Sequence, residues 1–443
     1  MDQFHHFHAK IQTLSNLNER IVNSHFPDEI GRCVSRPQRL SSQGGWSRQG
    51  ASENTGSGTP DLPPTTTTTP PPPRGPPALR PRLPMEVVEL ILRNLSKRQL
   101  LPVLLANKAL HSVAIALLYR EMVESRPAQC VLLVRRLLQT PAVHRHVRKL
   151  DINISTLECP TGNFYRLLQA LLRRTTTLTH LSLDFPKAHS PVWILDGCVF
   201  SLRQFSTSMH SSSELARFLE GQAQVTHLTL RGFQSDALKS LPYIYMDIAN
   251  SISPGLLVSR DSSFEQFVLG RESLKKLAVF NAIHAGPMVV RAVVEGRPVH
   301  TASIPLFSTN AVLSLDALES SAVPMKRLSV ISFDPNAPHF IFEEVAKRFT
   351  ELEALHIVVL LAEFTNELLL AACPFLSSFK KLKYITCVAT STEESTYAEE
   401  KEIAEKWHEK CATLKTIILP RGRVWFHKPS LTPGAGSWEC LED

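Results

Sequence analysis

Three leucines alternate with polar residues in Leu178-Thr179-His180-Leu181-Ser182-Leu183, a stretch with the spacing hydrophobic-x-x-hydrophobic-x-hydrophobic. Alternating apolar and polar side chains predict a strand with one buried side. The spacing recurs several times, so each copy predicts one further strand. The clear copies are Val225/Leu228/Leu230, Leu274/Leu277/Val279, Met325/Leu328/Val330, Leu352/Leu355/Ile357, Phe379/Leu382/Tyr384 and Leu414/Ile417/Leu419, and the weaker ones are Leu202/Phe205/Thr207 and Val299/Ala302/Ile304.

The copies recur at a nearly constant interval. Their middle positions are 23 to 27 residues apart from Leu181 to Leu228 and again from Leu277 to Leu382. The interval from Leu228 to Leu277 is 49 residues, which we interpret as two periods with one unreadable strand, and the last interval, to Ile417, is 35 residues. A period of about 20–29 residues with this signature is typical of a leucine-rich solenoid.

Amphipathic segments lie between the predicted strands and predict helices, at residues 163–173, 213–220, 287–295, 340–349, 363–371 and 397–410. In such a solenoid, parallel strands line the concave face and helices pack on the convex face. The Asn or Cys usual three residues after the third apolar position is absent, so we expect irregular repeats. Residues 124–428 therefore predict an α/β fold, an irregular leucine-rich-repeat solenoid.

A second informative stretch precedes the repeats and reads Leu83-Pro84-Met85-Glu86-Val87-Val88-Glu89-Leu90-Ile91-Leu92-Arg93-Asn94-Leu95. Proline is tolerated in the first turn of a helix, so a helix is expected to begin here. At about 100° per residue its apolar side chains cover an arc of about 200°, whereas a surface helix needs a stripe nearer 100°. The surplus predicts burial on two sides, one against its own domain and one against a partner protein.

Two further short helices are predicted after it, at Arg98–Leu105 and at Asn107–Met122. About forty residues in three short helices make a poor independent core. A partner, or the following domain, must therefore complete the packing of residues 83–123.

The same module resembles an F-box, a family that binds the small Skp-type adaptor of cullin–RING (SCF) ubiquitin ligases. The resemblance rests on Leu83-Pro84-x-Glu86, the aliphatic run to Leu95, the pair Leu100/Leu101 and the closing Ala116-Leu117-Leu118-Tyr119-Arg120. Where many F-boxes place a cysteine or serine and then a tryptophan, this chain has Asn107-Lys108-Ala109-Leu110-His111. The resemblance implies that the adaptor is contacted by Leu83, Pro84, Glu86, Val87, Leu90, Ile91, Leu95, Leu100, Leu101 and Leu104.

Two functions remain open at this point. In the first, the chain is a substrate-recruiting adaptor that binds a Skp-type adaptor, and through it a cullin, while the solenoid holds an unknown target protein near the ubiquitin-charged enzyme. In the second, the chain is a protein-interaction scaffold outside any ligase, and its F-box-like helices only cap the solenoid.

The end of the chain resembles the closing segment of F-box-like proteins of mushroom-forming fungi. The resemblance covers Trp407-His408-Glu409-Lys410-Cys411 to Pro420 and continues through Arg423-Val424-Trp425-Phe426. Bulky residues and a terminating proline can cover the edge that the last strand of a solenoid exposes. Residues 429–443 are expected to form a loose tail.

Two segments precede the helical module. Residues 1–30 carry Phe4, Phe7, Ile11, Leu14 and Ile21 at three- and four-residue spacing with one position skipped, which predicts a short amphipathic helix. Residues 31–82 are rich in Ser, Gly, Pro and Thr and cannot bury enough apolar area to offset their ordering entropy. They predict a disordered linker, although a proline-rich ligand for an aromatic groove remains an alternative.

Composition excludes several functional classes. No run of about eighteen apolar residues is present, so no transmembrane helix and no membrane partner are expected, and the N-terminus does not resemble a secretory signal. These features predict a cytoplasmic or nuclear protein. The net charge of +7 is dispersed without a basic helix face or a stacking array, so nucleic acid is not expected as a partner.

Signatures of catalysis are also scarce. The eight cysteines form no C-x-x-C pair, and no metal site, cofactor or enzyme motif is predicted. His180 and His227 should point out of their strands, and Asp151 and Asp184 follow strand leucines, but solvated side chains are the better interpretation of all four. Trp193, Trp407 and Trp425 are interpreted as core or cap residues.

Overall fold

The computed structural model describes residues 83–156, 162–187, 189–232, 267–392, 395–428 and 436–440. The chain divides into two compact units, and the division falls between Asn94 and Leu95. The described part of the smaller unit is residues 83–94, and that of the larger unit starts at Leu95. The predicted helix at residues 1–30 and the predicted linker at residues 31–82 lie outside the described residues.

Three short helices occupy the first forty described residues, as the sequence predicts. Helix α3 (Met85–Arg93) forms part of the smaller unit and follows Pro84, which lies at its N-cap. In the larger unit, α4 (Lys97–Val103) begins where the Ser96 amide donates to Gln99 Oε1 at 2.9 Å. Helix α5 (Lys108–Arg120) begins where the Leu110 amide donates to Asn107 Oδ1 at 2.9 Å, since a side-chain acceptor at the N-cap satisfies a free amide.

One open sheet of thirteen strands forms the centre of the larger unit, with the strands in sequence order from β1 to β13. Neighbouring strands from β1 to β11 are parallel, and β12 and β13 are antiparallel to their neighbours. The strands are β1 (Glu121–Glu124), β2 (Lys149–Asn153), β3 (His180–Asp184), β4 (Gln204–Thr207), β5 (His227–Leu230), β6 (Val279–Ala282), β7 (Thr301–Pro305), β8 (Arg327–Ser332), β9 (Ala354–Phe364), β10 (Tyr384–Thr392), β11 (Thr416–Ile418), β12 (Val424–Lys428) and β13 (Ser437–Cys440).

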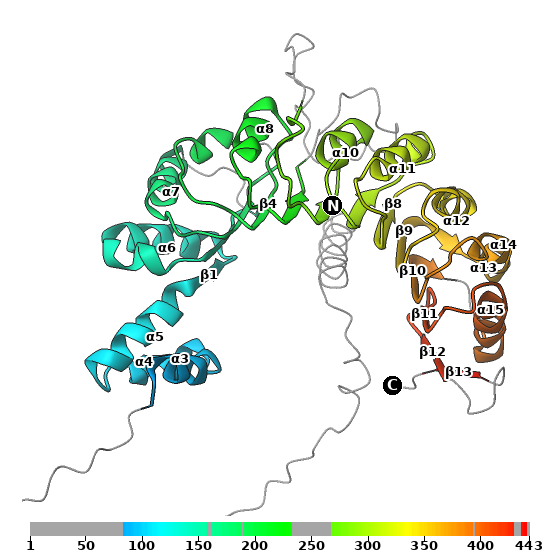
Figure 1. Ribbon diagram of the computed structural model, residues 1–443, viewed down its shortest axis with the longest axis horizontal. Coiled ribbons are helices and arrows are strands. Elements are labelled where there is room, and N and C mark those ends of the chain that lie inside the picture. Colours follow the sequence, from blue (N-terminus) through cyan, green and yellow to red (C-terminus); the bar gives the residue numbers. More distant parts are fainter. Residues whose placement is uncertain are drawn as a thin grey trace, which may run out of the picture. The chain divides into compact units, whose positions relative to one another are not determined.

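Helices connect the parallel strands and lie on one side of the sheet (Figure 1). Their apolar side chains join those of the strands in one main core, which includes Leu171, Leu181, Phe205, Val290 and Phe342. The helices are α6 (Pro127–Gln139), α7 (Gly162–Arg174), α8 (Ser213–Glu220), α10 (Pro287–Val294), α11 (Ala311–Glu319), α12 (Ala337–Arg348), α13 (Asn366–Ala371), α14 (Cys373–Leu376) and α15 (Tyr397–Lys410), with short 3-10 turns at η1 (Pro141–His146) and η2 (Val192–Leu195). Parallel strands alternating with helices in sequence order make this an α/β fold.

Two of the predicted strands are placed three residues too early. The register pairs Leu228 with Phe280 and Leu355 with Ile385, so the correct copies of the signature are Leu277/Phe280/Ala282 and Leu382/Ile385/Cys387. The error arises because both stretches carry a further apolar residue three positions upstream, so two frames fit the same spacing. With the correction, the interval from Leu355 to Ile385 is 30 residues and that from Ile385 to Ile417 is 32.

The predicted unreadable strand between Leu228 and Leu277 is wrong. Strand β5 pairs directly with β6 in parallel, through His227 with Val279 and Leu228 with Phe280. A direct ladder leaves no place in the sheet for a strand between them. The long interval is therefore a long connection between neighbouring strands and not a hidden repeat.

The sheet also extends beyond both predicted ends of the repeats. At its start, Val147, Leu150 and Ile152 carry the signature in strand β2, and β1 begins at Glu121, before the predicted boundary at residue 124. At its end, the predicted loose tail is wrong for residues 437–440, which form β13 and pair with β12. Strand β12 itself covers the edge of β11, as the cap interpretation of the closing segment predicts.

A buried arginine joins two connections in the middle of the sheet, that from β5 to β6 and that from β6 to β7. Arg297 is 2% exposed, and its guanidinium donates to the carbonyl oxygens of Gly270 and Ser273 at 2.9 Å and of Ala292 at 2.8 Å. Burial lowers the pKa of Arg297, but an arginine stays protonated in proteins. The charge is thus satisfied by backbone acceptors, as a buried charge requires.

Replacing Arg297 by methionine is expected to lower the free energy of unfolding by about 2 kcal/mol, because buried carbonyl oxygens lose their donors. Urea unfolding followed by circular dichroism measures the change. The control is Arg291→Met on the exposed side of α10, which is expected to change stability by no more than about 0.5 kcal/mol. Equal effects of the two substitutions would contradict the role assigned to Arg297.

Candidate partner-binding surfaces

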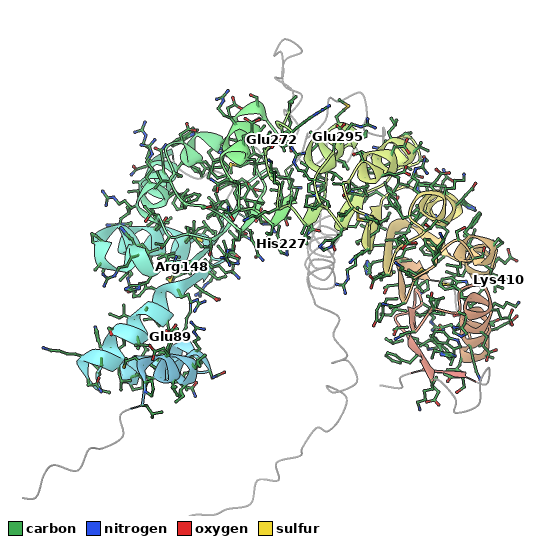
Figure 2. All side chains as sticks on the ribbon, viewed as in Figure 1. Glu89, Arg148, His227, Glu272, Glu295 and Lys410 are labelled. Atoms are coloured by element: carbon green, nitrogen blue, oxygen red, sulfur yellow. The ribbon has the colours of Figure 1, made fainter. Side chains whose placement is uncertain are left out.

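The first candidate surface lies on α3 and consists of exposed apolar side chains. Leu90 is 58% exposed, Ile91 is 53% exposed and Val87 is 37% exposed. Leu83 is 61% exposed, and Pro84 and Glu86 are exposed as well. The opposite side of the helix carries an ion pair, in which Arg93 Nη2 lies 2.6 Å from Glu89 Oε1. Glu89 is labelled in Figure 2. Helix α3 therefore has the wide apolar surface that the sequence predicts.

The predicted contact residues that follow α3 differ in exposure. Leu95 and Leu104 are half-buried, and Leu101 on α4 is 53% exposed. Leu100 is only 4% exposed, so its side chain packs inside the chain and offers little surface to a partner. Leu105 is 89% exposed and was not among the predicted contacts, although its position next to Leu104 could have pointed to it.

The second candidate surface is the face of the sheet that carries no helix among the described residues. Side chains alternate along each strand, so residues aligned by the register form rows across this face. One row, called here the central row, runs across β2 to β10 and is polar throughout. It consists of Asp151, Ser182, Ser206, Thr229, Asn281, Ser303, Ser329, His356 and Thr386.

The structure brings the polar residues singled out in the sequence onto this face. His180 and His227 both occupy the row before the central row, one on each side of Gln204, and His227 points away from the helix-bearing side, where Glu272, Glu295 and Lys410 lie (Figure 2). Asp151 lies beside Ser182, and burial raises the pKa of the Asp151 carboxyl. These groups lie on different strands at half-buried positions. They therefore form a polar surface of mixed imidazole, amide and carboxyl groups.

An apolar cluster lies on the same face near the carboxyl ends of β7 to β9. This sheet-face cluster consists of Phe307, Ile331, Phe333, Val358 and Leu360, with Val388 packed against it. The rings of Phe307 and Phe333 stack with centroids 6.2 Å apart. Sequence reasoning missed the cluster, although Ile357-Val358-Val359-Leu360 offers a signal. Four consecutive apolar residues place apolar side chains on both faces of a strand, and this pattern indicates that both faces are buried.

The predicted tryptophans differ in their surroundings. Trp407 and Trp425 are fully buried in the main core, as predicted, whereas Trp193 is 42% exposed on η2. The indole of Trp425 donates to Glu400 Oε2 at 3.1 Å. These two core tryptophans fix the last helix and the closing strands.

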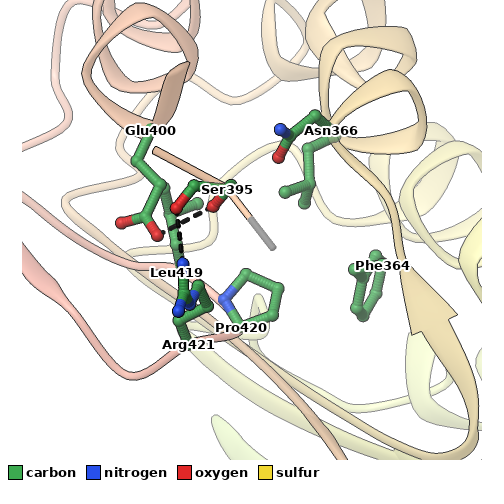
Figure 3. Close-up of a pocket in the computed structure, with 8 residues that line it drawn as sticks. Phe364, Asn366, Ser395, Glu400, Leu419, Pro420 and Arg421 are labelled. Carbon is green, nitrogen blue, oxygen red and sulfur yellow. Dashed lines mark hydrogen bonds between the residues drawn. The ribbon is translucent and has the colours of Figure 1, made fainter. Parts of the chain in front are cut away.

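The described residues hold no group of three or more His, Cys, Asp or Glu side chains arranged to bind a metal ion. A small hollow near α15 is lined by Phe364, Asn366, Ser395, Glu400 and Arg421, among others (Figure 3). The carboxylate of Glu400 accepts from Ser395 Oγ at 3.0 Å and, as above, from Trp425. Its acceptors are thus engaged within the fold, which suits a structural role.

Burial also sets the chemistry of the cysteines in the described residues. It raises the pKa of the Cys130 thiol to about 11 and raises that of Cys387 further still. A thiol is nucleophilic only as the thiolate, so these two are inert packing residues.

No helix in the described ranges has the length and apolarity needed to cross a bilayer.

Comparison with known proteins adds no relative. No protein-family model matches the chain, and no curated protein matches it significantly. The geometry of the two surfaces is therefore the basis for a functional assignment.

Proposed function

We propose that the chain is a substrate-recruiting F-box-type adaptor of a cullin–RING ubiquitin ligase. Residues 83–123 bind a Skp-type adaptor, and the repeats, which we take to be an irregular leucine-rich-repeat solenoid, bind a target protein on the helix-free face. The mechanism is proximity: the chain performs no chemistry itself and raises the local concentration of the target near the ubiquitin-charged enzyme.

The observation that carries the proposal is the exposure of α3. Had Val87, Leu90, Ile91 and Leu95 all been buried inside the chain, no docking surface would be left on this helix. Leu90 and Ile91 are instead more than half exposed. Burying a Leu or Ile side chain fully is worth about 1.5–3 kcal/mol, so two such residues can contribute strongly to a protein interface.

The arrangement of the sheet supports the second half of the proposal. Strands follow one another in sequence order, and the corrected intervals of 30 and 32 residues after Leu355 hold a strand with two short helices, α13 and α14, and a strand with one helix, α15. A sheet built this way has one face free of connecting helices in its described part, and that face presents aligned rows of side chains from many strands.

The competing function, a scaffold whose first helices are only a cap, is favoured by contacts of α4 and α5. Lys97 Nζ donates to the carbonyl oxygen of Glu121 in β1 at 2.7 Å, and the Arg148 amide donates to that of Arg120 at 2.9 Å. These contacts show α4 and α5 held at the first strand. They involve neither Leu90 nor Ile91, so capping by α5 is compatible with docking by α3.

The proposal is tested by co-purification of the full chain with a recombinant Skp-type adaptor. The double variant Leu90→Glu/Ile91→Glu is expected to recover at most about a tenth of the adaptor that the wild-type chain recovers, since an interface cannot bury two unpaired carboxylates. The control Val199→Glu alters a side chain that is 71% exposed and should recover as much adaptor as the wild type. If the double variant recovers as much adaptor as the wild type, or if the wild type recovers none, the ligase function is contradicted and the scaffold function is the one supported.

A further inference from the structure

The positive charge of the chain is concentrated in one region. Residues 125–183 contain nine Lys and Arg residues but only two Asp and Glu residues. Their excess of positive charge equals the net charge of the whole chain, which is +7. The rest of the chain is therefore neutral as a whole, and the basic character of the protein belongs to β2, β3 and the helices α6 and α7 that precede them.

Backbone hydrogen bonds align several of these basic residues where the first strands begin. The Arg148 amide donates to the carbonyl oxygen of Arg120 at 2.9 Å. The Thr179 amide donates to that of Arg148 at 2.9 Å, and the Arg203 amide donates to that of Thr179 at 2.7 Å. The four residues thus form one row directly before β1 to β4, and three of them are arginines. Since neighbouring strands lie about 4.8 Å apart, the row is about 14 Å long.

Three further basic residues lie beside this row. The carbonyl oxygen of Thr177 accepts from Arg148 Nη1 at 3.1 Å, and the Thr177 hydroxyl donates to the carbonyl oxygen of Arg145 in η1 at 3.2 Å. Arg174 is the last residue of α7 and precedes Thr177 by three positions. Lys149 follows Arg148 as the first residue of β2. The connections before β2 and β3 therefore bring these charges to the same edge of the sheet.

This set of side chains, named here the amino-edge patch, consists of Arg120, Arg145, Arg148, Lys149, Arg174 and Arg203. Four of the six side chains are exposed, and those of Arg120 and Lys149 are half-buried. The ion pairs of the described residues involve none of the six. Glu121 lies beside Lys149 in the register, yet no ion pair joins the two. The charges of the patch are thus available to a partner.

The imidazole of His180 responds to the potential of the patch. Burial is the largest cause of its lowered pKa, and the charge of Lys149 is the next. Arg203 and Arg120 lower the pKa of His180 further, whereas Glu121 opposes the change. Three positive charges from three neighbouring segments of the chain therefore act on one point at this edge, which is where an anionic group would be attracted.

The chemistry of the patch favours an acidic polypeptide as its partner. Guanidinium groups bind carboxylates through two parallel hydrogen bonds, and the patch is built mainly of arginines. Single-stranded nucleic acid is held by aromatic side chains that stack on its bases as well as by charge. The aromatic ring that adjoins the patch, that of Tyr119, instead packs against the main core. An extended polypeptide advances about 3.3 Å per residue, so about five residues cover the row.

We infer that the amino-edge patch binds an acidic segment of a partner protein, whose Asp and Glu carboxylates pair with Arg148, Arg203 and their neighbours. As a description of the recruited target, this inference rests on the proposed function: the target then carries a segment rich in Asp and Glu. The patch adjoins the helix-free face, because His180 on that face pairs in register with Lys149. The binding of the acidic segment itself needs neither adaptor nor ligase.

Fluorescence anisotropy with the full chain tests the inference. The probe is a fluorescein-labelled peptide of about eight residues in which Glu and Ser alternate, long enough to cross the row. The comparison peptide has Gln in place of each Glu. At about 0.1 M salt the chain should bind the Glu peptide at least about tenfold more tightly than the Gln peptide. Raising the salt to about 1 M shortens the Debye length from about 10 Å to about 3 Å and should remove the difference.

Charge reversal within the patch should weaken the binding of the Glu peptide. The double variant Arg148→Glu/Arg203→Glu is expected to raise the dissociation constant at least about tenfold. Because Arg148 also bonds Thr177, a second double variant, Arg145→Glu/Arg174→Glu, alters two other exposed side chains and should raise it at least about fivefold. Circular dichroism checks that both variants are folded.

The matched control is Arg291→Glu/Lys410→Glu, which changes the net charge by the same amount at exposed positions on α10 and α15. It should change the dissociation constant less than about twofold, since distant exposed charges are screened. Equal binding of the two peptides, no binding of the Glu peptide, or an equal loss in the control and in the patch variants would overturn the inference.

A labelled oligouridine in the same assay separates the two classes of partner. Binding of oligouridine that is lost in Arg148→Glu/Arg203→Glu, without a preference for the Glu peptide over the Gln peptide, would replace the inference by a surface for nucleic acid. No adaptor is present in these measurements. Failure of peptide binding therefore leaves the co-purification result unchanged, and failure of co-purification leaves the peptide result unchanged.

Discussion

Replacing Trp407 by alanine is expected to lower the free energy of unfolding by about 3–5 kcal/mol, the range for deletion of a large buried aromatic side chain. Trp407 lies on α15 and is fully buried. Its indole nitrogen donates to the carbonyl oxygen of Leu369 at 2.8 Å, and its ring packs edge-on against Phe342 with centroids 5.8 Å apart. The substitution removes a contact between three helices and leaves a buried carbonyl without its donor.

Urea unfolding followed by circular dichroism and by tryptophan fluorescence measures the loss. Trp193→Ala serves as the matched control because the same atoms are removed from a side chain that is 42% exposed. The control is expected to lower stability by no more than about 1 kcal/mol. If both substitutions have the same effect, Trp407 does not join the last helices to the core in the way described.

The second large effect is a dependence of stability on pH that arises from His356. Burial lowers the pKa of His356 from its ordinary value of 6.5 to about 4, because the charged form loses its hydration at this buried position. Its Nδ1 lies 3.4 Å from Ser329 Oγ, and its Nε2 has no partner among the described residues. The folded chain therefore keeps this imidazole neutral.

The sign of the effect follows from proton binding. Above pH 6.5 the side chain is neutral in the folded and in the unfolded chain, so it does not change stability. Between pH 6.5 and pH 4 the unfolded chain binds a proton that the folded chain does not, so stability falls as the pH falls. The total loss, reached near pH 4, is about 3 kcal/mol for a shift of this size.

The measurement compares unfolding free energies at pH 7.5 and pH 4.5 for the wild type and for His356→Gln. Because carboxylates also titrate in this range, the prediction concerns the difference: the variant should lose about 2–3 kcal/mol less than the wild type on acidification. His339→Gln, at an exposed position on α12, is the control and should lose as much stability between the two pH values as the wild type does. Parallel curves for all three proteins would contradict the pKa assigned to His356.

Much of the fold follows from the sequence because the strand signature is repeated. One spacing, applied nine times, locates strands β3 to β11, and the segments at residues 213–220 and 397–410 coincide with α8 and α15. The frame errors at Phe280 and Ile385 have a physical origin. A buried residue precedes each strand by three positions, so periodicity alone does not distinguish the turn from the strand.

The candidate surfaces are predicted less completely. The width of the apolar arc on α3 predicts the exposure of Leu90 and Ile91, since more apolar area is present than one side can bury. It does not predict that Leu100 is buried while Leu105 is exposed, because that depends on how α4 packs. The sheet-face cluster was missed for a related reason: Phe307 and Phe333 follow their strands, and only the register brings them together.

The antiparallel strands β12 and β13 have a consequence for how this architecture can grow. Parallel repeats lengthen by duplication when a new copy continues the direction of the one before it. Strand β12 instead pairs antiparallel with β11, and the segment between Ile418 and Val424 that joins them contains no helix, so the strand-and-helix alternation stops at β11 in the described residues. A duplicated unit of one strand and its helix keeps the parallel order when it is inserted between β1 and β11, so homologues with more strands are expected to carry additional copies there.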